Sequence, residues 1–275
     1  MKKEYFLLGI LSVILLAAGV WIYQIISEYQ KAEQEYEKLQ TYVKVEKKTK
    51  EPEDMKPETT EDDKEKEKPE ETVTVDFAAL QEINPDVVAW IRIPGVLEYP
   101  VVRGEDNSYY LNHTVQKTYN IAGSIFLDYR NERDFSDSKN IIYGHNMKDG
   151  SMFGGLKAYM DSEFFRKSPC IRIFRQGKWI VCPIFSCHVV QENDHSPYQA
   201  GMTKTEREAY FTAMSQQSLY DTGIKKYENE DFLTLSTCHG WGKRLVLHAI
   251  IPHEESEKGR ESIKIADFSV KKSQK

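Results

Sequence analysis

The sequence predicts a mainly β protein with added helices, in which an eight-stranded closed β-barrel is preceded by an N-terminal transmembrane helix. One observation behind this prediction is a single long apolar run near the N-terminus, followed by a strongly charged stretch. The other is a series of short apolar runs, rich in β-branched and aromatic residues, in the last part of the chain. Many short strands with few helices favour a closed barrel, because closure leaves no exposed strand edge.

The composition fits one sizeable folded core. The chain has 275 residues, of which 40% are hydrophobic and 12% are aromatic. Its 37 Lys and Arg against 43 Asp and Glu give a net charge of −6, so we expect no basic face and no nucleic-acid partner. The four cysteines are too few and too irregularly spaced for a disulfide-dense scaffold or a CxxC zinc site. We therefore expect no cofactor and no metal, and a reactive role for at least one cysteine.

The apolar run at residues 5–26 predicts a transmembrane anchor. Its only strongly polar members are Ser12 and Gln24, and a helix over its 22 residues is about 33 Å long, enough to cross a bilayer. A cleaved signal peptide is the alternative, but its apolar core would be shorter and no small-x-small cleavage site follows. Lysines in residues 1–4 favour a cytoplasmic N-terminus.

Two further segments are expected between the membrane and the folded domain. A juxtamembrane helix is predicted over 27–46, because apolar side chains repeat there at spacings of three and four: Tyr29, Ala32, Tyr36, Leu39 and Val43. Residues 47–71 contain 7 Lys, 11 acidic residues, three prolines and no aromatic residue, so they bury too little apolar surface to offset their chain entropy. The sequence therefore predicts a charged disordered linker over 47–72 and one folded domain over 73–275.

The folded domain is expected to contain eight strands with short helices between them. Each predicted strand is an apolar run bounded by turn residues: 89–93, 99–102, 123–127, 140–143, 170–175, 179–189, 231–238 and 244–250. Helical patterns interrupt these strands at 77–83, at 151–160 and over 205–219, where Thr205 is the expected N-cap.

Three strand ends carry side chains that suit acyl transfer. Cys238 ends the run DFLTLSTC, and Arg244 begins the next strand six positions later. His145 follows a strand that breaks at Gly144. A thiol, an imidazole and a guanidinium at strand ends can act as nucleophile, proton shuttle and oxyanion stabiliser. Lys243 is the local competitor of Arg244, although an ammonium lacks the planar fork that grips an oxyanion with two donors.

The remaining candidates have simpler interpretations. Cys170, Cys182 and Cys187 lie inside strands, where a cysteine is usually a small buried apolar residue. Ser236 stands two residues before Cys238 and so shares its face of the strand, which makes it a candidate for contact with a substrate.

Several motifs resemble one enzyme family. TLSTC (234–238) with the arginine downstream resembles the TLxTC signature of sortases, the membrane-anchored cysteine transpeptidases of Gram-positive bacteria. IRIPGVLEYPVVRGEDNSYYLNH (91–113), GSIFLDYRNERDF (123–135) and YGHNMKDGSMFGGLKAYMD (143–161) look like the class B branch. Two features depart from the family pattern, namely a shorter segment between Cys238 and Arg244 and the histidine that follows the cysteine directly.

The resemblance implies roles for the three side chains and a reaction. Cys238 would be the nucleophile, His145 the acid/base and Arg244 the group that steadies the substrate carbonyl. The enzyme would cleave a C-terminal sorting motif of secreted proteins, form a thioacyl-enzyme at Cys238, and transfer the acyl group to a cell-wall amine of a peptidoglycan precursor or cross-bridge. The helix at 205–219 would wall the peptide groove, and calcium dependence stays open because the loop residues Asp128, Asp134 and Asp137 lack EF-hand spacing.

The resemblance also implies a cellular location, and other functions fit the same residues. A single-pass protein of the cell membrane, with its catalytic domain on the extracellular face, would meet secreted substrates. The same thiol chemistry also fits a membrane-anchored cysteine protease that releases its product to water, or a sortase-like pilin polymerase. A membrane-tethered binding module with a buried cysteine is the non-enzymatic alternative.

Overall fold

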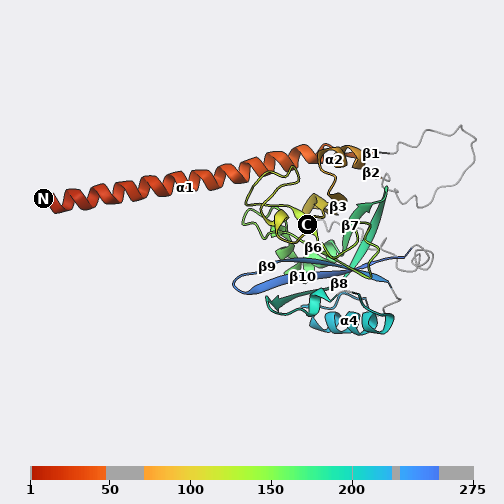
Figure 1. Ribbon diagram of the computed structural model, residues 1–275. Helices are drawn as coiled ribbons and strands as arrows, with labels where there is room; N and C mark the ends of the chain where they lie inside the picture. Colours follow the sequence, from red (N-terminus) through yellow and green to blue (C-terminus); the bar gives the residue numbers. More distant parts are fainter. Residues whose placement is uncertain (1, 48–70, 200, 225–229, 254–275) are drawn as a thin grey trace, which may run out of the picture.

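Eight strands form one closed barrel, as the sequence predicts (Figure 1). The computed structural model describes residues 2–47, 71–199, 201–224 and 230–253. The barrel strands are β3 (Val87–Ile93), β4 (Leu97–Val102), β5 (Ile125–Leu127), β6 (Lys139–Tyr143), β7 (Cys170–Arg175), β8 (Lys178–Gln191), β9 (Asp231–Cys238) and β10 (Lys243–Ile251). Each overlaps one of the eight predicted strands, so the predicted fold class is confirmed.

The strand order places β9 between β10 and β6. Around the barrel the order is β10-β8-β7-β3-β4-β5-β6-β9. β9 pairs antiparallel with β10 and parallel with β6. Because β6 and β9 run in the same direction, their carboxyl ends meet at one end of the barrel. The residues that follow these two strands are therefore neighbours, although about 90 residues of sequence separate them.

The short helices begin at side-chain caps. α2 (Phe77–Ile83) has the predicted bounds, and the Asp76 side chain accepts a hydrogen bond from the amide of Ala79. The N-cap of α4 (Lys204–Gln217) is Thr203, two residues before the expected cap Thr205. The expectation was wrong here because Glu206 lies three residues after Thr203 and completes a reciprocal capping box with it.

Two other helical segments differ from the sequence expectation. The helix expected over 151–160 is a 3-10 helix, η2, over Gly154–Met160. α3 (Ser162–Lys167), a six-residue helix capped by Asp161, was not predicted, because so short a segment has no clear helical period.

α1 (Lys2–Gln40) is one continuous helix that contains both the predicted anchor and most of the predicted juxtamembrane helix. Its apolar half projects away from the barrel (Figure 1), with its large side chains exposed. By length and mean hydropathy, 2.4 over its most apolar window, it is the one helix within the described ranges that could cross a membrane. A membrane anchor and a signal sequence both fit these properties.

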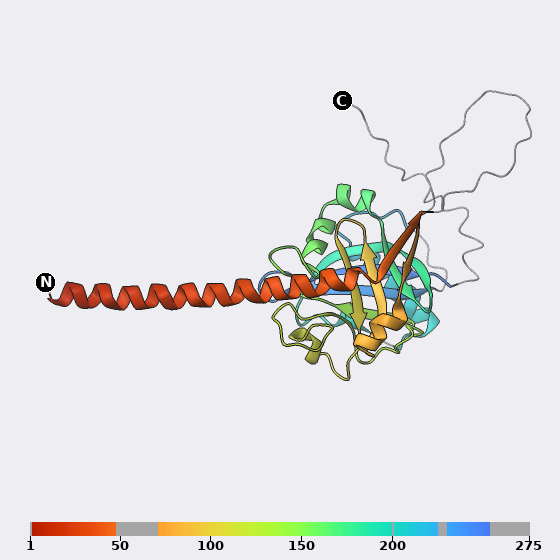
Figure 2. The same cartoon turned by 90° about the horizontal axis from the view of Figure 1, so that it is seen from above.

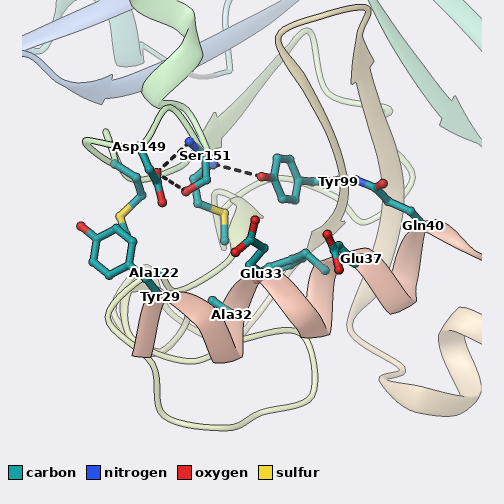
Figure 3. Close-up of a pocket in the computed structure, with 12 residues that line it drawn as sticks. Tyr29, Ala32, Glu33, Glu37, Gln40, Tyr99, Ala122, Asp149 and Ser151 are labelled. Carbon is teal, nitrogen blue, oxygen red and sulfur yellow. Dashed lines mark hydrogen bonds between the residues drawn. The ribbon is translucent and has the colours of Figure 1, made fainter. Parts of the chain in front are cut away.

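The other half of α1 packs on the barrel. The predicted apolar stripe is the buried face, since Ala32, Tyr36 and Leu39 retain 5% or less of their exposure. The Tyr36 hydroxyl donates to the carbonyl of Gly123 at 2.6 Å, and its ring meets Tyr99 edge-on at 5.2 Å. Figure 3 shows this face of α1 across a cavity of about 320 Å³ from Tyr99 and the loop that carries Asp149 and Ser151. The stripe is therefore a docking surface for the barrel itself.

Paired strands connect α1 to the barrel. The helix ends at Gln40 rather than at residue 46, because β1 (Val43–Lys47) pairs antiparallel with β2 (Glu71–Val75). β-branched valines at alternate positions of both strands favour this pairing over helix. The linker predicted over 47–72 lies, apart from its ends, outside the described residues. Since Lys47 pairs with Glu71, the two ends of that segment lie side by side, and the charged segment does not set the distance between α1 and the barrel.

Candidate active site

Cys238 carries the exposed thiol of the protein. It is the last residue of β9, and the six residues before it are buried. By contrast, Cys182 and Cys187 are buried in β8, as the sequence predicts, and Cys170 is half-buried. Burial raises the pKa of the Cys187 thiol to about 12 and also raises the pKa of Cys170, so both stay protonated near neutral pH. Among the four cysteines, Cys238 alone is both exposed and at the mouth of the barrel.

Arg244 lies directly opposite Cys238 in the antiparallel pair of β9 and β10. Opposed residues project from the same face of a sheet, with their Cβ atoms about 4.5–5.5 Å apart. Lys243 precedes Arg244 by one residue and so projects from the other face. The amide of His239 donates to the carbonyl of Lys243 at 2.8 Å, and both glycines of the turn have a positive φ, 67° and 65°. The short spacing that departs from the family pattern therefore places the arginine, not the lysine, beside the thiol.

Glu192 engages the Arg244 guanidinium. Nη2 of Arg244 lies 3.3 Å from Oε1 of Glu192, whose side chain is 63% exposed. Ion pairs this exposed contribute only about 0.2–1 kcal/mol. A substrate carbonyl can therefore replace Glu192 on the guanidinium at little cost.

His145 is held beside the end of β9 by the turn after β6. Tyr143 pairs with Ser236 in the parallel ladder, and the Thr237 hydroxyl donates to the carbonyl of Gly144 at 2.8 Å. A Cβ at Gly144 would lie 2.8 Å from the Phe153 ring, so a larger residue would push this turn outward. The geometry explains why a glycine precedes the histidine.

The tautomer of His145 follows from its hydrogen bond. Nε2 of His145 lies 2.6 Å from the carbonyl oxygen of Leu111. Because a carbonyl only accepts, Nε2 carries the proton, and Nδ1 is the atom left to exchange protons in the neutral ring. The next residue, Asn146, donates from Nδ2 to the carbonyl of Cys238 at 2.8 Å, which ties the histidine loop to the cysteine strand.

One groove of roughly 640 Å³ brings the predicted site residues together. Cys238, His145, Arg244 and Ser236 all line it. The sequence did not predict the other residues that complete its walls. Phe126 and Tyr143 lie in β5 and β6. The rest lie in loops and short 3-10 turns that no periodicity marks: Asn107, Leu111, Arg130, Glu192, His195 and Tyr198.

Tyr198 forms one wall of the groove and bonds to its floor. Its hydroxyl lies 2.8 Å from Oγ of Ser236, which is buried. Burial raises the pKa of Tyr198, and the Ser236 hydrogen bond only partly opposes this, so the phenol stays neutral near neutral pH. A hydroxyl pair of this kind can donate to or accept from a peptide backbone.

The expected groove wall over 205–219 is wrong. None of the described residues in that range lines the groove. Tyr210, Phe211 and Met214 of α4 instead pack on Phe185 and Phe232 in a separate apolar cluster. The wall comes from the shorter 3-10 turn at Ser196–Tyr198, because the amphipathic face of α4 is used to cover the barrel.

The acidic loop residues have structural partners. The Asp128 carboxylate accepts two hydrogen bonds from the Arg130 guanidinium, at 2.9 and 2.7 Å. Burial opposes ionisation of Asp128, but these hydrogen bonds outweigh it and hold its pKa below the usual value. Asp134 caps the turn at Ser136, and Asp137 accepts from Asn131. Within the described ranges no group of three His, Cys, Asp or Glu side chains could hold a metal ion.

The closed barrel thus carries an exposed thiol, an arginine in register with it and a histidine at the adjacent strand end. No protein-family model matches the chain. Sortase B of Listeria monocytogenes is 37% identical over 160 residues, which are 58% of this chain and 65% of that protein, just under two thirds.

Solved structures extend the comparison to the fold. The chain superposes on Clostridium perfringens sortase B with a TM-score of 0.61 and 33% identity, over 64% of this chain and 100% of that one. Sortase B of Bacillus anthracis gives a TM-score of 0.66 at 28% identity, over 82% of this chain and 99% of that one. The chain belongs to the class B sortases.

Proposed function

We propose that this chain is a membrane-anchored cysteine transpeptidase that cleaves a sorting motif near the C-terminus of secreted proteins and transfers the acyl product to a cell-wall amine. The observation that carries the proposal is the register of Cys238 with Arg244, in a groove that His145 also lines. The family of the chain supports the same reaction class.

The acylation step uses each side chain once. The Cys238 thiolate attacks the carbonyl carbon of the scissile amide, so a C–S bond forms and the carbonyl electrons move to oxygen. The Arg244 guanidinium donates hydrogen bonds to that oxyanion in place of Glu192. As the C–N bond breaks, protonated His145 gives its proton to the leaving amine, and a thioester remains on Cys238.

The transfer step reverses these roles. The amine of the acceptor attacks the thioester carbonyl, a C–N bond forms and the C–S bond breaks. His145 takes the proton that the amine loses, and Cys238 returns to the thiolate. Solved relatives include sortase B complexed with triglycine and a Staphylococcus aureus sortase B–substrate complex. A glycine amine is therefore the first acceptor to test.

A product analysis tests the proposal. The full chain in detergent is incubated with a panel of sorting-motif peptides, without an acceptor, with triglycine or with a lysine-bearing pilin peptide, and the products are identified by mass spectrometry. Ligated peptide and a transient adduct on Cys238 are the expected results. Hydrolysis alone, at every amine concentration, would favour the protease alternative, and ligation restricted to a pilin lysine would favour the polymerase.

The location is part of the same proposal. α1 anchors the chain with residues 1–4 in the cytoplasm and the barrel on the extracellular face, where secreted substrates are met. Lys2 and Lys3 before the apolar run support this orientation.

A further inference from the structure

We propose that the barrel rests on the membrane through a rim made by Tyr119, Ile121 and Trp241, so that the mouth of the Cys238 groove lies at the lipid headgroup surface. The occupant of this rim is the interfacial layer of the bilayer that holds α1. The proposal goes beyond the anchoring of the chain, since an anchor alone leaves the position of the barrel open.

The first observation is the exposure of the rim. Trp241 is 100% exposed and Tyr119 is 62% exposed, and Ile121 retains 38%. Single exposed apolar residues are common on soluble proteins and need no explanation. A fully exposed tryptophan between two glycines is a different case, because its large apolar ring packs against no part of its own protein. Tryptophan and tyrosine are enriched where one side of the ring is apolar and the other is wet, as at a membrane interface.

The second observation fixes the level of Tyr119 and Ile121 along α1. Asn120 stands between them, and its Nδ2 donates to the carbonyl oxygen of Glu28 at 2.8 Å. Glu28 is two residues beyond Ile26, the last residue of the apolar run, so the two lie about 3 Å apart along the helix axis. If residues 5–26 fill the hydrocarbon core, Tyr119 and Ile121 lie at the level of the lipid headgroups.

The third observation is the direction of the turn between β9 and β10. In Figure 1 this turn points to the same side as the free apolar half of α1, and Figure 2, seen from above, agrees. Trp241 occupies that turn, three residues after Cys238. A barrel docked on α1 therefore presents Trp241 and the groove mouth toward the bilayer. Substrates that are themselves membrane-bound would reach Cys238 from the membrane plane, where confinement raises their effective concentration.

Tryptophan fluorescence tests the rim, and it tests the anchor separately. The full chain is reconstituted into nanodiscs of phosphatidylcholine and phosphatidylglycerol. The acyl chains are plain, brominated near the headgroup, or brominated near the chain end, because bromine quenches only tryptophans that reach it. The chain has four tryptophans, of which Trp90 is buried and Trp179 bonds to the carbonyl of Val73. Trp21 reports on the span and Trp241 on the rim. The variants compared are W21F, W241F and the double variant.

The expected result is that the W21F protein keeps a component quenched by bromines near the headgroup end of the chain, and that the double variant loses it. W241F should keep the component that Trp21 gives inside the hydrocarbon region. Quenching in wild type that vanishes completely in W21F would show that α1 is anchored but that Trp241 is in water, which overturns the rim. Quenching of neither tryptophan would overturn the anchor and the rim together. Full quenching of Trp241 by aqueous iodide in nanodiscs would also overturn the rim.

Discussion

Removing one hydroxyl from α1 should slow the enzyme, because that hydroxyl supports the loop that holds His145. Tyr36 donates to the carbonyl of Gly123 at 2.6 Å. Gly123 lies against the backbone of Leu111, since a Cβ there would be 2.5 Å from the Leu111 carbonyl oxygen. That same oxygen accepts from Nε2 of His145 at 2.6 Å. Three contacts therefore connect the docked helix to the imidazole.

The magnitude follows from the hydrogen bond. Tyr36 is 5% exposed, and loss of a buried hydrogen bond of this kind costs about 0.5–1.5 kcal/mol. If the whole cost falls on the position of the loop, Tyr36→Phe lowers the population with His145 in place, and hence kcat, by at most about tenfold. Gly123→Ala should do more, because its φ of 57° and the contact with Leu111 both resist a side chain.

Matched controls separate positioning from stability. Tyr29→Phe changes a half-buried tyrosine of α1 whose hydroxyl makes no hydrogen bond among the described residues, and Gly177→Ala has a φ of 79° in open space. Steady-state kinetics, the pH profile of Cys238 alkylation and thermal unfolding are measured for all four variants. We expect lower kcat and a shifted pH profile for Tyr36→Phe and Gly123→Ala, with KM nearly unchanged. A fall in Tm with wild-type kcat and pH profile in both would refute the reasoning.

Three further outcomes are expected. Cys238→Ala should abolish turnover with an unchanged Tm, and equal loss in Cys182→Ala would contradict the assignment of the nucleophile. Arg244→Lys should lower kcat by about 10²–10³, as for loss of an oxyanion donor, while Lys243→Ala has little effect because it projects from the other face. Trypsin added to protoplasts should cut the lysine-rich segment 48–70. The barrel should nevertheless stay on the membrane until urea is added, because α1 stays docked on it. Complete protection of the chain on a denaturing gel would indicate the reverse orientation.

The sequence was most informative where a pattern has a physical period. Alternating and β-branched runs predicted the eight strands, and the three- and four-residue spacing predicted the face of α1 that contains Tyr36. It could not predict what that face packs against, because a stripe carries no information on its partner. Most residues in the walls of the groove were not predicted either, because no sequence pattern indicates which segments meet in the folded barrel. Leu111, Glu192 and Tyr198 lie in short turns with no sequence period, and only the closure of the barrel brings them to the groove that Cys238 lines.

The loop at 106–124 connects the docked part of α1 to the candidate active site. It meets α1 at Glu28 through Asn120 and, about two turns further along the helix, at Tyr36 through Gly123, and it holds His145 through Leu111. A shift of the helix relative to the barrel would therefore move both the rim and the imidazole. Trp241 follows Cys238 by three residues, so the third residue of the proposed rim lies in the turn that follows the candidate nucleophile. In this arrangement the docked helix is a structural part of the active site, because its Tyr36 supports Gly123 from outside the barrel.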